Sequence, residues 1–402
     1  MKQSELFLKT SKEKPKESDN ISAELLIRAG FIDKLSAGIY TFLPLGLRVL
    51  RKIENIIRKD LDAIGGEEIL MPVLQPKSIW DESGRWKTMD PPLFKVEDRH
   101  KKLFALGPTH EEVITKIIRE RIKSYKNLPF MLYQIQTKFR NEMRFSGGLL
   151  RVKEFVMKDA YSFHADKLDL EGYYDKIASA YGNIFARLDL EVINVTASSG
   201  TIGGKVSHEY MVLAESGEDK IVICKKCNIA LNSEVSKDNK CPKCKEEMEE
   251  KSAIEVAHIF QLGTVYSEKM NANFINQNGE QKPIEMGCYG IGLGRLIATI
   301  IEVNHDDKGI IWPEAVSPFD IHLINLAKEP KQAEEIYQEL SKKYDVLYDD
   351  RDISAGEKLA EADLIGIAKR VVVSEKTIKV NKVELKLRLE KEAKLVKLKE
   401  LL

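Results

Sequence analysis

Two strand-like segments joined by a glycine pair place the strongest constraint on the fold of this chain. FMLYQIQTKFRNE precedes Gly147 and Gly148, and LLRVKEFVMKDAYSF follows them. Aromatic and β-branched residues favour strands, and glycines between two such runs are typical of the turn of a hairpin. The sequence therefore predicts a long hairpin of two antiparallel strands.

Four side chains of this hairpin predict a nucleotide site. Arg140 and Glu142 are two residues apart and Arg151 and Phe155 are four apart, so each pair shares a face if the segment is a strand. The guanidinium groups can bind phosphate or carboxylate. Glu142 can accept hydrogen bonds from an exocyclic amine, and Phe155 offers a stacking face for a base. A solvated hairpin with scattered charges is the alternative, and the combined set weighs against it.

A second glycine-rich motif is GCYGIGLGR. Gly290, Gly292 and Gly294 do not have dinucleotide-fingerprint spacing, and the lysine and hydroxyl residue of a P-loop are absent. Arg295 instead begins a predicted helix directly after glycines that allow a close approach. A tight strand–helix junction would explain the glycines alone, but an arginine at this position favours a pocket shared with Arg140.

Apolar residues recur at helical spacing in three further segments. The first predicted helix covers residues 45–64 and ends at Gly65-Gly66. The second runs from Glu111 to about Lys123, and the third lies between Leu168 and Arg187. The segment EILMPVLQP is predicted to be a strand, which Pro72 confines to a sheet edge or a bulge.

The pattern of predicted secondary structure changes near Pro318, where we place a domain boundary. Beyond it, strand-like IHLINLA, VLYD and RVVVS alternate with helix-like EEIYQELSKKY and GEKLAEADLIG. This alternation predicts a small α/β domain with a partly parallel sheet.

Charge and composition exclude several classes of protein. The 402 residues have a net charge of zero, so no global field draws the chain to nucleic acid. The N-terminus lacks the apolar core of a signal peptide, and the longest apolar run is too short to span a bilayer. We therefore expect a cytoplasmic protein.

Four of the five cysteines form two C-x2-C pairs, Cys224 with Cys227 and Cys241 with Cys244, separated by thirteen residues. This spacing is close to that of a zinc ribbon, in which four thiolates make a closed structural site. Zn²⁺ is the first choice of metal and iron the second. Free surface thiols are the alternative.

Three features resemble the three signature motifs of class II aminoacyl-tRNA synthetases: the proline of the edge strand after the long helix at 45–64, the hairpin motif FRNE…GGLLRVKEF, and GIGLGR. Further stretches are similar to prolyl-tRNA synthetases of the bacterial type, over nearly the whole chain apart from the cysteine segment. These stretches are SAGIYTFLPLGLRVL, GPTHEE, VMKDAYSFH, HIFQLGTVYS, EMGCYGIGLGR, GIIWPEAVSPFDIHLI and DDRDISAGEKLAEADLIGI.

The resemblance implies an α/β fold class, with an α+β catalytic domain on an antiparallel sheet, a small zinc-ribbon-like insertion and a C-terminal α/β anticodon-binding domain. The expected boundaries are 1–220 and 252–305 for the discontinuous catalytic domain, 221–251 for the insertion, 306–317 for a linker and 318–402 for the anticodon-binding domain.

The resemblance also implies a reaction: L-proline and ATP form prolyl-adenylate, and the prolyl group passes to the 3′ end of tRNA(Pro). Arg140 and Arg295 are the expected catalytic residues, because they hold the phosphates. The residues expected to bind ATP, together with Mg²⁺, are Arg140, Glu142, Arg151, Phe155, Gln261, Thr264 and Arg295.

A second set of residues is expected to bind proline. The loop GPTHEE resembles the family's loop that reads the ring amine, and a carboxylate suits a secondary ammonium. The set is Thr109, Glu111, Arg140, His258 and Cys288; a histidine such as His258, taken by itself, is more often structural. Many bacterial relatives carry an editing domain between the second and third motifs, for which the segment from Phe155 to Gly287 leaves no room.

The expected partners are tRNA(Pro), L-proline, ATP and a second copy of the chain, with no membrane. The resemblance assigns the helix at 45–64 and the strand at Pro72 to a homodimer interface. A helix buried inside a monomer would show the same apolar stripe.

Some positions depart from the family pattern. Ala368 stands where proline is usual, Ser354-Ala355-Gly356 replaces an arginine-proline-glycine turn, and Ala257 replaces a glycine. These changes weaken inferences about anticodon contacts. Two alternatives stay open: a class II synthetase for threonine, serine, glycine or histidine, and a non-catalytic paralogue that binds RNA or regulates another protein.

Overall fold

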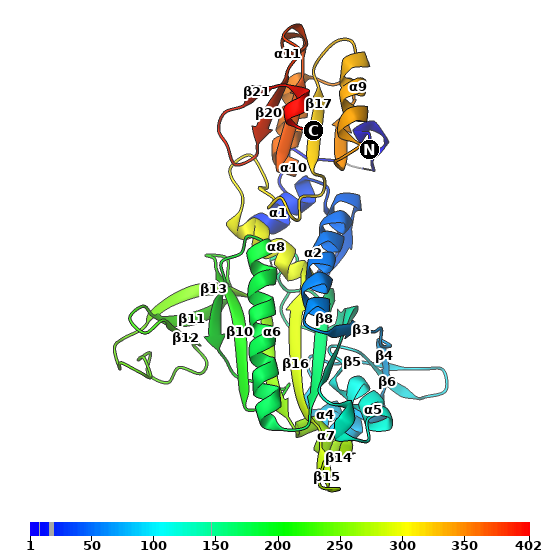
Figure 1. The fold of residues 1–402 in the computed structure, drawn as a ribbon, viewed down its shortest axis with the longest axis vertical. Coiled ribbons are helices and arrows are strands. Elements are labelled where there is room, and N and C mark those ends of the chain that lie inside the picture. Colours follow the sequence, from blue (N-terminus) through cyan, green and yellow to red (C-terminus); the bar gives the residue numbers. More distant parts are fainter. Residues whose placement is uncertain (8, 16–19, 146) are drawn as a thin grey trace. The chain divides into compact units, whose positions relative to one another are not determined.

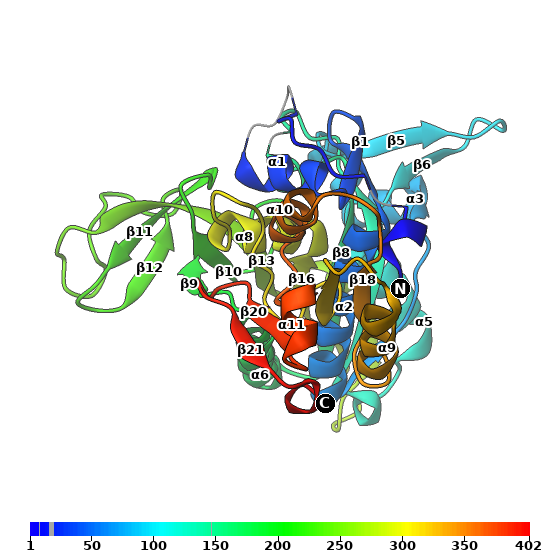
Figure 2. The same cartoon turned by 90° about the horizontal axis from the view of Figure 1, so that it is seen from above.

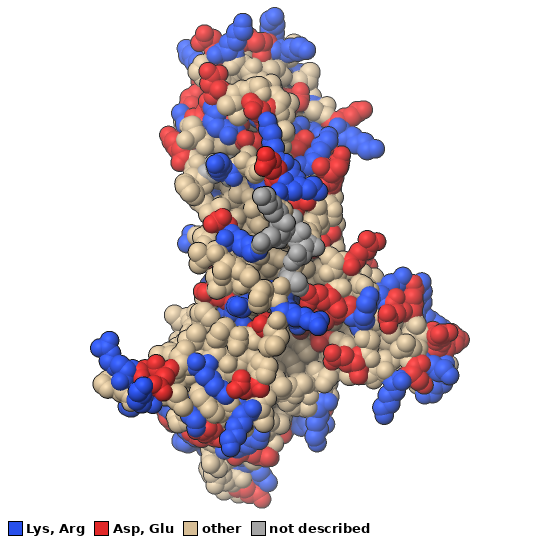
Figure 3. Space-filling view, turned by 180° about the vertical axis from the view of Figure 1, so that it is seen from behind, with Lys and Arg blue, Asp and Glu red and all other residues tan. Residues whose placement is uncertain are grey.

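The computed structural model describes residues 1–7, 9–15, 20–145 and 147–402 (Figure 1). Acidic and basic side chains are interspersed over the face shown in Figure 3, in keeping with the zero net charge. Within the described ranges, no helix is both long and apolar enough to cross a membrane.

Contacts between residues group the chain into two compact units. The larger unit contains residues 37–39 and 54–299, and the smaller contains residues 1–36, 40–53 and 300–402. Two helices, α2 (Pro44–Ala63) and α8 (Leu293–Val303), have residues in both units. The domain boundaries given above were predicted from sequence motifs, whereas these two units are defined by contacts. The predicted boundaries therefore stay a prediction.

A large, mainly antiparallel sheet forms the centre of the larger unit. Its nine strands among the described residues have the order β10-β9-β12-β11-β13-β16-β8-β7-β3. Helix α6 (Lys167–Arg187) packs along β8 and β16 (Figure 1). The strands are β3 (Gly66–Glu68), β7 (Phe130–Phe139), β8 (Glu154–His164), β9 (Ile193–Thr196), β10 (Val206–Leu213), β11 (Asp219–Cys224), β12 (Ile229–Asn232), β13 (Glu249–Gly263) and β16 (Glu285–Gly292).

Smaller elements complete this unit. A three-stranded sheet has the order β4-β6-β5, and β14 pairs with β15. The elements are β4 (Leu74–Pro76), β5 (Phe94–Glu97), β6 (Leu103–Leu106), β14 (Asn273–Ile275), β15 (Gln281–Pro283), α3 (Lys77–Ser83), α4 (Arg85–Thr88), α5 (Glu111–Arg121) and α7 (Val265–Lys269), with a 3₁₀ turn at Tyr125–Asn127.

The predicted hairpin is present as β7 and β8, but its strands are shorter than expected. Pairing ends where Phe139 faces Glu154, and the described residues between the two strands, 140–145 and 147–153, form a loop that we call the loop 140–153. Gly147 and Gly148 both have positive φ, at 63° and 60°, which explains why glycines stand there. The argument that Arg140 and Glu142 share the face of a strand was therefore wrong, since both lie outside β7.

The segment EILMPVLQP was predicted as one strand and is two, β3 and β4. Pro72 lies between them and has no backbone N–H for a ladder. The backbone N–H of Met71, just before it, donates to the side-chain oxygen of Gln134 at 2.9 Å. The chain therefore leaves the large sheet at this point and joins the three-stranded sheet.

The three predicted helices are confirmed as α2, α5 and α6. Gly65, directly after α2, has φ of 85°, as expected of a glycine that ends a helix. The apolar stripe of α2 is buried within the single chain, with Ile53, Ile57 and Leu61 all 0% exposed. The stripe thus matches the buried-helix alternative and carries no argument for a dimer.

The smaller unit contains the predicted C-terminal α/β fold. The described strands of its larger sheet have the order β18-β17-β19-β20-β21; β17 is parallel to both β18 and β19, and the last two pairings are antiparallel. A partly parallel sheet is therefore confirmed. The elements are β17 (Ile321–Asn325), α9 (Lys331–Leu340), β18 (Val346–Asp349), α10 (Ala355–Ile365), β19 (Lys369–Val373), α11 (Glu375–Lys379), β20 (Val383–Leu387) and β21 (Lys394–Val396).

The rest of the smaller unit comes from the N-terminal part of the chain. Its α1 is capped by Asn20, whose side chain accepts from the backbone N–H of Ala23. The elements are α1 (Ile21–Arg28), β1 (Ile32–Ser36) and β2 (Ile39–Phe42), with 3₁₀ turns at Gln3–Glu5 and Leu398–Glu400.

Candidate functional site

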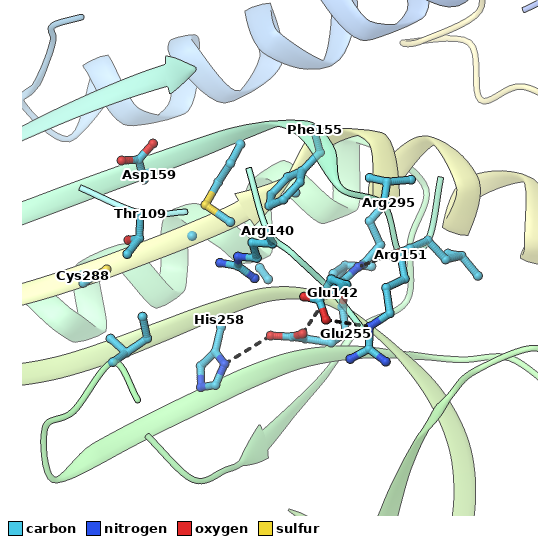
Figure 4. A pocket seen from close by; sticks show the side chains of 18 of the residues that line it. Thr109, Arg140, Glu142, Arg151, Phe155, Asp159, Glu255, His258, Cys288 and Arg295 are labelled. Atoms are coloured by element: carbon cyan, nitrogen blue, oxygen red, sulfur yellow. Dashed lines mark hydrogen bonds and ion pairs between the residues drawn. The ribbon is translucent and has the colours of Figure 1, made fainter. Parts of the chain in front are cut away.

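A cavity of about 180 Å³ lies in the larger unit, between β8, β13, β16 and the loop 140–153 (Figure 4). Most of the residues predicted from the sequence line it, although they come from distant parts of the chain. They are Thr109, Glu111, Arg140, Glu142, Arg151, Phe155, His258, Cys288 and Arg295.

Arg140 lies in the middle of this cavity (Figure 4). Its backbone N–H donates to the carbonyl of Lys153 at 2.9 Å, and its guanidinium lies 5.3 Å from the centre of the Phe155 ring. Burial, followed by the positive charge of Arg295, lowers the pKa of Arg140. Its Nε has no hydrogen-bond partner within the described part of the chain. The cavity therefore holds a cation suited to an anionic ligand.

Two further guanidinium groups line the cavity, that of Arg295 in α8 and that of Arg151 in the same loop as Arg140. Arg295, in the first turn of α8, donates from Nε to the carbonyl of Leu150 and from Nη1 to Glu255 Oε2, at 2.9 and 2.8 Å. Arg151 is more exposed; its Nη1 lies 3.1 Å from a carboxylate oxygen of Glu218, and its Nε 3.7 Å from one of Glu142. The loop 140–153 and the junction of β16 with α8 thus bring three arginines together.

Glu255 on β13 lines the cavity and was not singled out from the sequence. Burial by itself would raise its pKa, but a hydrogen bond from His258 and the charges of Arg295 and Arg140 hold the pKa at about 2. Glu209 on β10 lies 3.5 Å from His258 Nδ1, and burial followed by repulsion from Glu255 raises its pKa to about 7. Glu209, Glu255 and His258 come together because β10 pairs with β13, and the spacing along the chain does not show this cluster.

Glu111, Thr109 and Cys288 form a buried group at another part of the lining. Glu111 begins α5, and one of its carboxylate oxygens accepts from Thr109 Oγ1 at 2.7 Å. The other accepts from the thiol of Cys288 at 3.1 Å. Burial and the neighbouring carboxylate of Glu111 raise the pKa of Cys288 well above its usual range, so this thiol stays neutral and acts as a donor.

Asp159 on β8 also lines the cavity and was missed. Its carboxylate forms an ion pair with Lys138 Nζ at 2.7 Å and accepts hydrogen bonds from Gln134 Nε2 at 2.9 Å and from the hydroxyl of Tyr161 at 2.8 Å. Burial would raise its pKa, but the charge of Lys138 together with the contributions of His110 and Gln134 outweighs burial and lowers the pKa. The available sequence signal was a charged Lys158-Asp159 pair inside an otherwise apolar strand.

Gln261 and Thr264 are not among the residues that line this cavity. His258 and Phe260 line it from β13, but Gln261, the residue after Phe260, does not. Gly263, with φ of 61°, then turns the chain, and the hydroxyl of Thr264 donates to Glu268 at 2.7 Å. Their contacts with a nucleotide stay a prediction, which this cavity does not support.

The four paired cysteines form a second candidate site. Each offers a sulfur, and all four sulfurs lie within 4.8 Å of one another; Cys224 and Cys244 are 3.6 Å apart. The residue after each pair, Asn228 or Lys245, has positive φ, at 52° and 63°. The two turns thus have matching backbones. They lie beyond β11 and β12, which project to one side of the sheet (Figure 2).

Comparison with family models matches most of the chain. A model described as tRNA synthetase class II core domain (G, H, P, S and T) matches residues 94–304. A model described as anticodon binding domain matches residues 315–402. The predicted fold class, a class II core followed by an anticodon-binding domain, is therefore confirmed.

Curated relatives match the chain over its full length. A proline–tRNA ligase from Wolbachia sp. subsp. Drosophila simulans is 44% identical over 415 positions, covering 100% of this chain and 98% of the relative. One from Ehrlichia chaffeensis is 44% identical, covering 98% and 97%. One from Halothermothrix orenii is 36% identical over 543 positions, covering 96% of each. That alignment is longer than the 402 residues of this chain, so this relative carries segments that the chain lacks.

Solved structures share the fold at low sequence identity. Prolyl-tRNA synthetase of Giardia lamblia, in complex with prolyl-adenylate, has a TM-score of 0.80 at 20% identity and covers 94% of this chain and 74% of its own. The Cryptosporidium parvum enzyme, complexed with L-proline and AMP, has a TM-score of 0.78 at 17% identity, covering 94% and 72%.

Proposed function

The chain belongs to the proline–tRNA ligases, and we propose that the cavity around Arg140 is where it joins L-proline to ATP. The reaction forms prolyl-adenylate and diphosphate, and the prolyl group then passes to the 3′ end of tRNA(Pro). The observation that carries the proposal is that one cavity is lined by both Glu111 and Arg140. The carboxylate suits the ring ammonium of proline, and the guanidinium suits the carboxylate and the α-phosphate.

In the first step, a carboxylate oxygen of proline attacks the α-phosphorus of ATP, and the bond to the diphosphate breaks. No side chain has to act as a nucleophile, so the protein contributes position and charge. Arg140 would hold the α-phosphate beside the proline carboxylate, where negative charge builds up. Thr109 and Glu111 would hold the ring ammonium, with Cys288 as a neutral donor to Glu111.

The remaining cavity residues suit the rest of ATP. Phe155 would stack on the adenine, Glu142 would accept from its amine, and Arg151 and Arg295 would bind the outer phosphates. Mg²⁺, when bound with ATP, neutralises phosphate charge, and Glu255 with Glu209 beside it are the oxygen ligands that suit it. In the second step, a hydroxyl of the terminal adenosine of tRNA attacks the prolyl carbonyl, and AMP leaves.

Aminoacylation tests this function directly. The purified chain should attach labelled proline to a tRNA(Pro) transcript in the presence of ATP and Mg²⁺. A folded protein that charges no tRNA with proline would contradict the proposal. Attachment of threonine, serine, glycine or histidine instead would assign the chain to another synthetase.

We propose the motif-based division of the chain as its domain structure: a catalytic domain at 1–220 and 252–305, a metal-binding insertion at 221–251, and a linker at 306–317. The anticodon-binding domain then covers 318–402, and the match of the family model to 315–402 supports it. A fragment 318–402 that folds by itself would support this division. A fragment that folds only when residues before 306 are included would contradict it.

The four-cysteine cluster is proposed to hold a structural Zn²⁺, because four thiols on two matching turns suit tetrahedral coordination. Protein purified without chelators should contain one zinc ion per chain by elemental analysis. Cys241→Ala should lose the metal because it removes one ligand. Cys288→Ala is the matched control and should keep it, since Cys288 lies in the cavity. Absence of zinc and iron from the unmodified protein would contradict the site.

We also propose a homodimer that works in the cytoplasm, where tRNA and ATP are available. Support for the dimer comes from exposed leucines around β4 and β6: Leu70 is 75% exposed, Leu74 50% and Leu103 39%. Sedimentation should give a molecular mass of twice the 45.7 kDa of one chain. The double substitution Leu70→Asp with Leu74→Asp should lower this mass toward that of a single chain. A monomeric unmodified protein would contradict the dimer. Cell fractionation that recovered the protein outside the cytoplasm would contradict the location.

A further inference from the structure

A buried arginine behind the cavity is bound to the glutamate that the proposed function assigns to proline. Arg85 begins α4, is 5% exposed and is not among the residues that line the cavity. Its Nη1 lies 3.3 Å from Glu111 Oε2 and 3.0 and 3.1 Å from the two carboxylate oxygens of Glu112. One nitrogen therefore bridges two neighbouring carboxylates.

The surroundings fix the plane of this guanidinium. Its central carbon lies 5.3 Å from the centre of the Trp80 ring and 5.5 Å from that of the Tyr266 ring. Arg85 Nη2 contacts the sulfur of Met89 at 3.0 Å. With aromatic rings on the guanidinium, the direction of Nη1 toward Glu111 is set by packing.

Several charged groups surround Glu111. Glu112 and Asp159 are acidic, Arg85 and Lys138 are basic, and Arg140, which also lines the cavity, interacts electrostatically with Glu111. His110 adds no charge at neutral pH, since burial and the charge of Lys138 lower its pKa to about 4. Glu112 is bound by Arg85 and Ser83, and Asp159 by Lys138. Glu111 shares Arg85 with Glu112 and, unlike Glu112, lines the cavity.

Two adjacent buried carboxylates ordinarily share a proton, because like charges disfavour ionisation in a poorly solvated site. Burial raises the pKa of Glu112, and the charge of Arg85 is the strongest influence against that rise. Without Arg85, Glu112 would lose the charge that opposes the effect of burial, and Glu111 would lose the cation that holds its carboxylate in place.

We propose that Arg85 is a positioning residue for proline recognition: it holds the carboxylate of Glu111 directed into the cavity without touching the substrate. The inference rests on the proposed function, because Glu111 reads the ring ammonium only if this cavity binds proline. Arg85 acts on the amino-acid end alone and has no contact with the residues assigned to ATP.

The test measures proline-dependent ATP–pyrophosphate exchange, with separate KM values for proline and ATP. Arg85→Met should raise KM for proline roughly 30-fold or more, because a buried charge partner is lost, while KM for ATP changes little. Arg85→Lys keeps the charge but not the planar guanidinium held by the aromatic rings, and it should raise KM for proline only about 3- to 10-fold. Arg119→Met, on α5 but away from Glu111, is the control and should match the unmodified protein.

A double variant separates charge from packing. Arg85→Met with Glu112→Gln removes one positive and one negative charge. KM for proline in the double variant should therefore be lower than in Arg85→Met and closer to that of the unmodified protein. Equal changes in the KM values for proline and ATP, or no recovery in the double variant, would overturn the inference. If Arg85→Met does not fold, Arg85→Lys provides the test, and an unchanged KM for proline in that variant overturns the inference. An unmodified protein without proline-dependent exchange would instead refute the proposed function.

Discussion

Arg140→Ala is expected to lower proline-dependent pyrophosphate exchange roughly a thousandfold or more, because the proposed mechanism places its guanidinium where charge develops in the adenylation step. The side chain lies in the middle of the cavity, and Nε has no partner among the described residues. A buried cation held without a partner is poorly solvated, so a phosphate or carboxylate that enters gains a strong charge-assisted contact.

The structural cost of this substitution should be small. Within the described residues, the Arg140 side chain makes a ring contact with Phe155 but no hydrogen bond. Thermal unfolding should therefore stay close to that of the unmodified protein. Arg144→Ala is the matched control, since Arg144 is exposed in the same loop and should leave exchange unchanged. A folded Arg140→Ala protein that retained most of its activity would remove Arg140 from the mechanism.

Glu111→Gln is expected to have the second-largest effect, a rise of about 100-fold or more in KM for proline with little change in KM for ATP. Glutamine keeps the size of the side chain and one oxygen acceptor, but it removes the charge that pairs with a secondary ammonium. Thr109 and Cys288 donate to the two oxygens of Glu111, and one of these donors would face the amide nitrogen instead.

A matched control lies on the same helix. Glu120 is near the end of α5, is exposed and pairs with Lys116 at 2.9 Å. Glu120→Gln should leave both KM values as they are, because a surface ion pair contributes little. An unchanged KM for proline in Glu111→Gln would show that another group binds the ring ammonium.

Much of the fold could be predicted because its signals are local. Apolar spacing together with Gly65 defined α2, and the strand runs on either side of Gly147 and Gly148 defined the hairpin. The end points of the strands were not predictable in this way. The last backbone hydrogen bond between the two arms runs from Arg140 to Lys153. The next backbone N–H, that of Asn141, donates instead to the carbonyl of Pro92, which is distant in the sequence, so the pairing ends there.

The site was predicted where a motif marks it and missed where only folding creates it. Arg140, Arg295 and Glu111 stand in recognisable motifs. Arg85 is linked to the site by its bond to Glu111, and Glu255 by its bonds to Arg295 and His258, which no spacing along the chain reveals.

The roles expected of Gln261 and Thr264 stay a prediction. Gln261 follows Phe260, the last β13 residue that lines the cavity, and Thr264 comes after the turn at Gly263. A motif identifies residues by their place in the sequence, whereas the fold decides which of them line one cavity.

The central claim is that this cavity activates proline, and ATP–pyrophosphate exchange with a panel of amino acids tests it most directly. Proline, alanine, cysteine and threonine would be compared at equal concentrations with the purified chain, and the Arg140→Ala protein would serve as the blank. The account predicts exchange that is fastest with proline, weaker with alanine or cysteine, and lost for all of them in the variant. Exchange that is fastest with another amino acid, or that persists without Arg140, would contradict it.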